Sequence, residues 1–502
     1  MPLKVLLLSP PIFDFYYSFH RSEPLGLLYM KEALAEYDWL CVTIFDARYK
    51  GTTKAIQMPE IFSYLHHLYV QDTSWFSLFH GFKRFGYSYD TIVNYIKENA
   101  YDVVCISSLF SAYHHDVEVL VSRIKKETGA IVIVGGWAVW ADTNIIENGK
   151  ADFYVRGDGE LTLPELLQEI YCSNGNIAHL PKLINSESVS VNELFMNTFP
   201  HRDTWYAYYG KRMANIICSK GCVYRCDFCS IHSRYHYHQR SIHSIQQELE
   251  YLYSHGVKIV NFEDDNFLFN RSFAKQLLSL MKYYKTKGMQ FLCMNGVTAS
   301  NLYAVINDAL EAGFLEFNLS LVSSHEEVVV HHNRPALQDI IKDIAWKSVG
   351  KVRVIVYIIA GLPGATVTTC IDDILFLASL PVIIGFSPLY MLPGVQLFES
   401  MGVPEDRRLC RGSALYSFGE GFTREDIAAL WKLCRFINRL KIANENTDEL
   451  NVHYEFYKKA CKEHVWYYRN KNGLWHEGFS FSAFLPESFT ICDINGVTKC
   501  IG

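Results

Sequence analysis

The sequence lacks a long apolar run, because no stretch of about 18 uninterrupted apolar residues occurs in its 502 residues. It also lacks an excess of positive charge. Its 47 Lys and Arg face 53 Asp and Glu, for a net charge of -6, which provides no basic footprint for nucleic acid. The opening MPLKVLLLSPP is too short for a secretion signal and favours a first buried strand. We therefore expect a cytoplasmic protein with no transmembrane segment that binds no nucleic acid.

The composition is that of a globular protein, with 49% hydrophobic and 20% charged residues. At about 150 residues per domain, the length predicts roughly three domains. The sequence contains 14 cysteines and no recognisable secretion signal, which favours metal or redox chemistry over a disulfide framework. Four of these cysteines fall between positions 218 and 229, which makes this segment the first candidate for a site.

Residues 1–175 alternate apolar runs with helical periods, which predicts parallel βαβ units in a doubly wound sheet of about five strands. The predicted strands are 4–9, 41–46, 103–107, 131–135 and 153–157. Thr162 and Glu165 have the spacing of a capping box and predict the start of the last helix of this domain. Residues 176–212 are rich in Asn, Ser, Pro and His, which indicates a linker.

A second alternation begins near residue 213 and predicts six strands separated by helices. The predicted strands are 214–218, 258–262, 290–294, 315–321, 352–359 and 383–389. Six strands predict an open, partial (β/α)6 barrel over residues 213–395, with its site at the C-terminal strand ends. Residues 396–502 are predicted to form a mostly helical C-terminal extension, with one clear helix over 424–440.

Cys222, Cys226 and Cys229 form a C-x3-C-x2-C arrangement just past the first predicted barrel strand. Three thiolates on one loop suit a 4Fe-4S cluster, because the fourth iron then stays open for another ligand. The alternative is zinc, with Cys218 or His232 as a fourth ligand. Structural zinc sites usually draw two ligand pairs from separate turns, whereas every candidate here lies in one short segment. We therefore favour the cluster.

This stretch, with Phe228 before the last cysteine, resembles the signature of the radical S-adenosylmethionine (radical SAM) superfamily. The resemblance implies that the three cysteines ligate a 4Fe-4S cluster and that its open iron is chelated by SAM. In that family one electron splits SAM into methionine and a 5'-deoxyadenosyl radical. An electron donor such as flavodoxin or ferredoxin is implied with it.

Later segments also resemble the family in order: QRSIHSIQQEL at 239–249, FEDDNF at 262–267, LSLVSS at 319–324 and GLPGAT at 361–366. The family usually has Glu where this sequence has Ser323 and Ala365, which is a departure from its pattern. The resemblance implies carboxylates for the ammonium group of SAM and a serine for its ribose or carboxylate. The implied SAM contacts are Phe228, Glu263, Asp264, Asp265, Ser324 and Gly361.

The segments FGYSYDTI, YDVVCISS, VGGW and DFYVRGDGE, within residues 85–160, resemble the cobalamin-binding domain that precedes the barrel in class B radical SAM enzymes. A nicotinamide domain is rejected, because G-x-G-x-x-G is replaced by Ser9, Pro10 and Pro11 after the first strand. Ligands of open parallel sheets lie at the carboxyl ends of the strands. The implied cobalamin contacts at such ends are Ser107, Ser108, Gly135, Gly136 and Gly157.

Cobalamin domains often supply a histidine to cobalt from a D-x-H-x-x-G loop, which this sequence lacks. Asp46 to Gly51 has the spacing but carries Arg48, which stays protonated and cannot ligate a metal. The expectation is therefore cobalt without a histidine ligand, or a domain that has lost its corrinoid.

Together these resemblances imply a cobalamin-dependent radical SAM enzyme that methylates an unactivated carbon of a small-molecule or natural-product substrate. The first alternative is a radical SAM oxidation, cyclisation or rearrangement without methyl transfer. A non-catalytic zinc or iron-sulfur protein is the third hypothesis. The 15% aromatic content suits a bulky or apolar substrate, but aromatic packing in the core explains it equally well.

Overall fold

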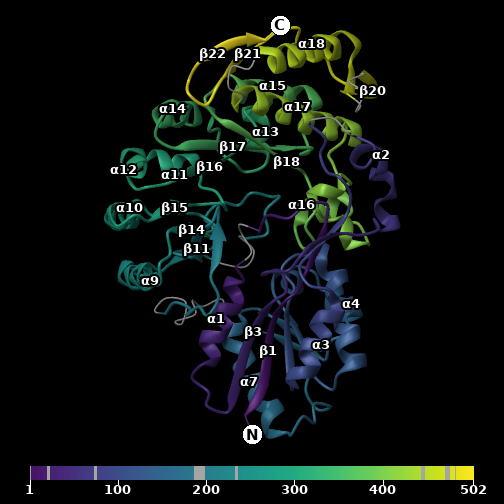
Figure 1. Ribbon diagram of the computed structural model, residues 1–502, viewed down its shortest axis with the longest axis vertical. Helices are drawn as coiled ribbons and strands as arrows, with labels where there is room; N and C mark the ends of the chain where they lie inside the picture. Colours follow the sequence, from purple (N-terminus) through teal and green to yellow (C-terminus); the bar gives the residue numbers. More distant parts are fainter. Residues whose placement is uncertain are drawn as a thin grey trace.

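The computed structural model describes residues 2–19, 23–72, 76–185, 198–231, 236–442, 447–469, 475–480 and 482–501. The chain forms two α/β halves stacked along its long axis (Figure 1). The N-terminus lies at the far end of the first half, and the C-terminus lies at the opposite end of the molecule.

The N-terminal half is a parallel sheet in the order β3-β1-β6-β7-β8-β9. Its strands are β1 (Leu3–Ser9), β3 (Leu40–Asp46), β6 (Val103–Ser107), β7 (Ile131–Gly135), β8 (Phe153–Arg156) and β9 (Leu183–Asn185). Strand β9 comes from the segment predicted as a linker.

Helices cover both faces of this sheet. Val5 and Leu7 of β1 pack with α1 (Leu25–Leu34) and α7 (Gly159–Cys172). Leu6 and Leu8 pack on the other side, with α3 (Tyr89–Asn99), α4 (Ser111–Glu127) and α5 (Trp137–Ala141). Because both faces are buried, the strands are continuous apolar runs. The doubly wound prediction is confirmed.

The predicted start of α7 is wrong. The helix begins at Gly159, so Thr162 lies inside its first turn, where its Oγ1 donates to the carbonyl of Asp158 at 3.3 Å. A serine or threonine at this position bonds back to the preceding turn instead of capping the helix.

The second half contains six parallel barrel strands in chain order. They are β11 (Lys211–Ile216), β14 (Ile259–Phe262), β15 (Gln290–Leu292), β16 (Glu316–Val322), β17 (Arg353–Ala360) and β18 (Ile383–Pro388). Strand β10 (Tyr206–Tyr208) adds an antiparallel strand at the first edge. Bridges from Phe291 to Phe314 and from Val297 to Leu319 join β15 and its following loop to β16. The predicted six-stranded partial barrel is confirmed.

The barrel helices lie outside the strands (Figure 1). They are α9 (Ile242–Ser254), α10 (Arg271–Thr286), α11 (Ala299–Tyr303), α12 (Ile306–Glu311), α13 (Glu326–His331), α14 (Gln338–Ser348) and α15 (Val367–Ala378). Helices α11 and α12 are short and follow each other directly along the chain.

The last barrel strand, β18, is covered by α17 (Arg424–Ile442). The Asn438 side chain accepts from the N–H of Ile384 and donates to its carbonyl, both at 2.8 Å, so it satisfies the strand edge. The segments η2 (Glu60–Leu65) and α2 (His66–Tyr69) from the N-terminal half join the same core, where the Tyr69 hydroxyl donates to the carbonyl of Ser413 at 2.6 Å. The two halves are therefore packed together.

The C-terminal extension is helical but also contains two antiparallel strand pairs. Its helices are α16 (Gln396–Met401), η4 (Arg407–Leu409), η5 (Gly412–Ala414), α17 and α18 (Thr447–Glu463). Its strands are β19 (Val465–Arg469), β20 (Trp475–Ser480), β21 (Phe489–Cys492) and β22 (Thr498–Ile501).

Three short strands, β2 (Ile12–Asp14), β4 (Thr53–Ala55) and β5 (Lys83–Phe85), form a small sheet of their own. Strands β12 (Ser219–Lys220) and β13 (His238–Gln239) pair with each other. The remaining short helix is α6 (Asn144–Asn148). In the described part of the chain, no helix combines the length and apolar character needed to cross a membrane.

A buried network of four charges joins the two halves. Arg202 donates to Glu23, which precedes α1, at 2.8 Å, and Arg240 donates to Glu248 of α9 at 2.6 Å. Arg202 also lies 3.4 Å from Glu248, which connects the two pairs. All four side chains are at most 1% exposed. The network is electrically balanced only while every member is present.

Candidate functional site

The three cysteines of the C-x3-C-x2-C motif follow β12 and lie on one loop. Burial raises the pKa of the Cys222 thiol, and it raises that of the Cys229 thiol to about 11. The neighbouring thiols of the motif add to both shifts, because a second negative charge on the same loop would repel the first. Thiolates crowded in this way suit cations that they can share.

The cysteine loop is anchored to the far side of the barrel by His332, whose side chain is fully buried. Its Nδ1 lies 2.9 Å from the carboxylate of Asp227, between the second and third cysteines, and its Nε2 lies 2.9 Å from the carbonyl oxygen of Pro363. Both partners present oxygen atoms, so the ring is held in place at both of its nitrogens. Phe228 packs edge-on against the same ring. His332 thereby ties the loop to the GLPG turn.

The arrangement fits a 4Fe-4S cluster better than zinc. A zinc ion draws its ligands to within about 2.3 Å of one centre, whereas a cluster separates them over several irons. No three His, Cys, Asp or Glu side chains among the described residues are gathered tightly enough for a single ion. Cys218 is fully buried, and its neighbours include Asp264 and Arg240. His232, the other candidate zinc ligand, lies outside the described residues.

Two of the three carboxylates after β14 support the segment that leads into the cysteine loop. Asp264 accepts from the Ser219 hydroxyl at 2.5 Å and from the N–H of Cys218 at 3.1 Å, and burial raises its pKa to about 7. Asp265 accepts from the N–H of Gly221 at 2.8 Å, and burial raises its pKa as well. Glu263 accepts from Asn261 at 2.6 Å. Asp264 is 1% exposed, while Glu263 and Asp265 are partly exposed.

We expect Asp264→Asn to change the pH dependence of stability. A carboxyl whose pKa rises from 3.8 to about 7 on folding binds its proton more tightly in the folded state, so stability falls as pH rises between these values. The variant loses this contribution, and its melting temperature should fall less between pH 5 and 7.5 than that of the wild type. Thermal unfolding of both proteins across this range provides the measurement.

The exposed Asp308→Asn serves as the control, because the Asp308 side chain is 45% exposed and should leave the profile unchanged. An Asp264→Asn profile that parallels the wild type over this range would contradict a structural role for the carboxyl.

The other predicted SAM residues also lie at the C-terminal strand ends, and the structure records their protein contacts. The backbone N–H and hydroxyl of Ser324 both donate to Asp373 of α15, at 2.6 and 2.5 Å. Gly361 has φ +94°, and its carbonyl accepts from Gly419 at 2.7 Å. Only glycine adopts this backbone conformation readily, which explains the first glycine of GLPG.

A cavity of about 290 Å³ lies at the C-terminal edge of the N-terminal sheet. Four of the five predicted cobalamin residues line it: Ser107, Gly135, Gly136 and Gly157. The fifth, Ser108, is buried behind it, 3.0 Å from Nδ1 of His114. We name this space the sheet-edge cavity.

The glycine at position 136 has a structural reason of its own. It has φ +110°, and a Cβ there would lie 2.6 Å from the carbonyl oxygen of Ser108. The backbone directly after β7 therefore contacts the backbone directly after β6. This contact alone excludes a side chain at position 136. At Gly135, by contrast, a Cβ would make ordinary contact with Val155 at 3.5 Å.

The sheet-edge cavity faces the barrel. Lys220 of β12, two residues before the first cysteine of the motif, lines the cavity and lies 4.0 Å from Glu160 of α7. The carboxyl ends of both sheets thus meet at one place, where the cysteine loop and the cavity are neighbours. A group in the cavity and a group on the cysteine loop would face a common space.

Arg48, in the loop with the cobalt-ligand spacing, is buried in an ion pair with Asp46 at 2.9 Å and a hydrogen bond to the Tyr17 hydroxyl at 3.0 Å. Desolvation opposes its charge, but these partners outweigh it and raise the pKa of the guanidinium. Arg48 therefore stays a cation, as expected from the sequence.

One contact of the cysteine loop was missed by sequence reasoning because no motif marks it. Arg334 donates to the sulfur of Cys226 at 3.7 Å, across 108 positions of sequence. Only the folded chain brings these residues together.

Comparison with known families identifies both halves. Residues 216–377 match the radical SAM superfamily, and residues 80–167 match the B12 binding domain. These domains imply a 4Fe-4S cluster, SAM and cobalamin as cofactors.

Among curated relatives, a methyltransferase from Synechocystis described as uncharacterized is 28% identical over 171 residues, covering 33% of this chain and 30% of the relative. The cytidylyl-2-hydroxyethylphosphonate methyltransferase of Streptomyces wedmorensis is 23% identical over 378 residues, covering 65% of this chain and 66% of the relative. The chain spans less than half the length of the first two curated relatives that it matches.

Solved structures share the fold. The radical SAM methyltransferase TsrM from Kitasatospora setae, with cobalamin and a 4Fe-4S cluster bound, has a TM-score of 0.60 at 16% identity, covering 80% of this chain and 75% of that chain. The cobalamin-dependent SAM radical enzyme OxsB has a TM-score of 0.59 at 11% identity, covering 90% of this chain and 70% of that chain.

Proposed function

We propose that this chain, which carries a B12-binding domain followed by a radical SAM domain, is a cobalamin-dependent radical SAM enzyme that methylates a carbon of a small molecule. The observation that carries the proposal is that two sheet edges meet, one with the three-cysteine loop and the other with the sheet-edge cavity. Lys220 belongs to both, because it precedes the cysteine loop and lines the cavity. Two cofactors held there would share one reaction space. The methyltransferase relatives support the reaction class.

When bound, the cluster would supply an electron for SAM cleavage and cobalamin would supply a methyl group. Cys222, Cys226 and Cys229 hold the cluster in this proposal, and Arg334 donates to the sulfur of the ligand Cys226 at 3.7 Å. The His332 bonds to Asp227 and Pro363 keep the loop in place beside the GLPG turn.

For SAM, we propose that the partly exposed Glu263 and Asp265 receive the ammonium group at the end of β14. Asp264 is a weaker candidate, because its carboxylate already accepts bonds from Ser219 and Cys218 inside the fold. We propose Phe228, Ser324 and Gly361 as further contacts at the same opening. An electron donor of the flavodoxin or ferredoxin type and a cytoplasmic location belong to this proposal.

For cobalamin, we propose that the sheet-edge cavity receives the aromatic base of the nucleotide tail, with Ser107, Gly135 and Gly157 in contact and Ser108 supporting them from behind. The cavity is lined largely by aliphatic side chains and backbone, including Leu7, Leu27 and Ile133. An apolar slot suits a flat base. The domain limits we propose are 1–175, 213–395 and 396–502, with a linker over 176–212.

We expect Gly135→Val to weaken hydroxocobalamin binding by roughly tenfold or more, because a branched side chain would occupy the cavity. Cluster content should be unchanged, since Gly135 lies on the N-terminal sheet and not on the cysteine loop. Titration followed by corrinoid absorption, with iron and sulfide analysis of the same samples, provides the measurement.

Gly129→Val is the matched control, because a Cβ at position 129 would meet nothing within 4 Å. Equal cobalamin affinity for both variants and the wild type would refute the cavity as the cobalamin site. SAM cleavage without any bound corrinoid would favour the alternative chemistry without methyl transfer.

A further inference from the structure

A second cavity, of about 470 Å³, lies between the two halves and beside the cysteine loop. Ser230, which directly follows Cys229, lines it, together with Arg156 at the end of β8 and Trp140 of α5. We name it the Arg156 cavity. Gly394 and Ala141 form another part of the wall. Gly394 has φ +77°, and a Cβ at this position would lie 2.5 Å from the carbonyl oxygen of Ala141. The wall is therefore set by a close backbone contact between the two halves.

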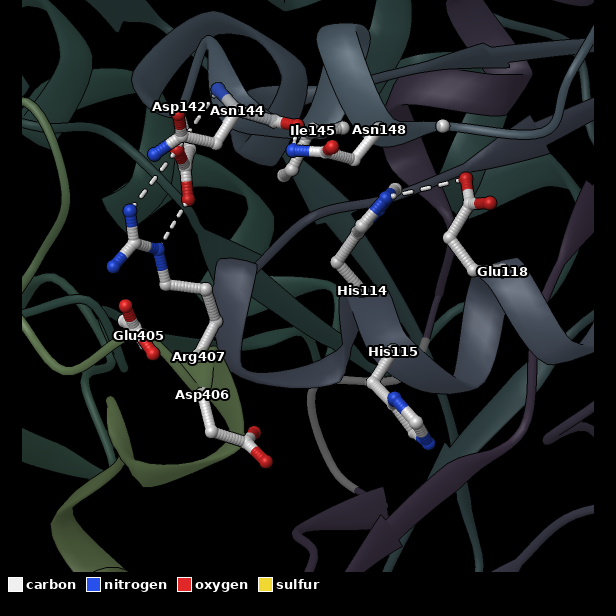
Figure 2. Close-up of a pocket in the computed structure, with 11 residues that line it drawn as sticks. His114, His115, Glu118, Asp142, Asn144, Ile145, Asn148, Glu405, Asp406 and Arg407 are labelled. Atoms are coloured by element: carbon white, nitrogen blue, oxygen red, sulfur yellow. Dashed lines mark hydrogen bonds and ion pairs between the residues drawn. The ribbon is translucent and has the colours of Figure 1, made fainter.

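Most charges around the Arg156 cavity are already compensated. Arg407 donates to the carboxylate of Asp142 at 2.5 Å, and Figure 2 shows the two side chains directed at each other. Asp142 is 3% exposed, which makes this a well-shielded pair. Glu399, which also lines the cavity, accepts from the backbone N–H of Gly394 at 2.9 Å, and its negative charge, like that of Asp142, acts on Arg407. Neither Arg407 nor Asp142 therefore leaves an unbalanced charge for a ligand.

Arg156 is the exception. Its Nε is fully buried and makes no hydrogen bond, and within the described parts of the chain no carboxylate lies close enough to pair with the guanidinium. The guanidinium lies over the ring of Trp140, 4.7 Å from the ring centre. This contact fixes the orientation of the guanidinium group but gives none of its N–H donors a hydrogen-bond acceptor. A cation held in a fixed orientation with unused donors is complementary to an anion.

We propose that the Arg156 cavity binds an anionic group of the substrate, a carboxylate or a phosphate, with Arg156 as its anchor. Arginine presents two parallel N–H donors that match either group. The position of Ser230 in the wall places the anchored group next to the loop that carries the cysteines, so the remainder of the substrate can extend into the space between the sheet edges. The assignment of the anion to the substrate rests on the proposed function, whereas the anion site itself does not.

The test uses inorganic phosphate as the probe. Isothermal titration of the cluster-reconstituted, cobalamin-loaded full chain should show one phosphate per chain for the wild type. Arg156→Gln should weaken binding by roughly tenfold or more, and Arg156→Lys should retain part of it, because lysine keeps the charge but loses the two-point contact. Arg271→Gln, at an exposed position of α10, should bind as the wild type does.

Wild-type protein that binds no phosphate would overturn the proposal, as would an Arg156→Gln variant that binds it unchanged. If bound cobalamin abolishes phosphate binding and Arg156→Gln weakens cobalamin binding, Arg156 serves the corrinoid and the substrate assignment is wrong. If phosphate binds at Arg156 but the enzyme transfers no methyl group, the anion site stands and the proposed function fails.

Discussion

Replacing Cys222, Cys226 or Cys229 with Ala should abolish both the cluster and SAM cleavage. Each supplies one of three thiolates on a single loop, and a cluster with two protein ligands would expose a second iron to solvent. After anaerobic reconstitution, we expect about four irons and four acid-labile sulfides per wild-type chain and almost none in each variant. Iron and sulfide analysis, with chromatography of the 5'-deoxyadenosine product, provides the measurement.

Cys218→Ala is the control for these variants. Cys218 belongs to the same run of cysteines but is fully buried in the barrel core and borders Asp264. The variant should keep its cluster and its SAM cleavage. Stoichiometric zinc without acid-labile sulfide in the wild type, or loss of the cluster in Cys218→Ala, would contradict the assignment.

Glu248→Ala should cause the largest loss of stability among these single changes. Glu248 pairs with both Arg202 and Arg240 in the buried network, so its removal leaves two guanidinium groups with the single carboxylate of Glu23. Breaking a buried ion pair from one side typically costs about 3 to 5 kcal/mol, because the remaining charge stays desolvated. The first thermal unfolding transition should fall by roughly 10 °C.

The matched control is Glu311→Ala, which breaks the exposed pair between Lys282 and Glu311, where the Glu311 side chain is 72% exposed. Such a pair contributes about 0 to 1 kcal/mol. Calorimetry of both variants compares the two directly. If Glu248→Ala melts within a degree of Glu311→Ala, the network does not stabilise the junction between the halves.

The order of elements was predictable from sequence because it depends on local periodicity. Runs such as VLLLS and VVCIS are apolar on both faces, and strands of that kind occur in parallel sheets covered by helices on both sides. The C-x3-C-x2-C spacing is equally local, so the candidate cluster ligands were found without a structure. The strand pairs β19–β20 and β21–β22 were missed, because their short segments carry no sustained alternation.

By itself, the sequence determined the main strands and helices of the two α/β halves, the loop that carries the three thiols, and the strand ends that carry glycines. Only the tertiary structure decided what those residues contact. In the sequence, Asp264 is one of three consecutive acidic residues, whereas in the fold it accepts a hydrogen bond from Ser219 of β12. No motif distinguishes Arg156, and only the folded chain places it in a cavity lined by residues of both halves. The physical reason is that burial and charge balance are set by partners tens to hundreds of residues apart, which no local pattern records.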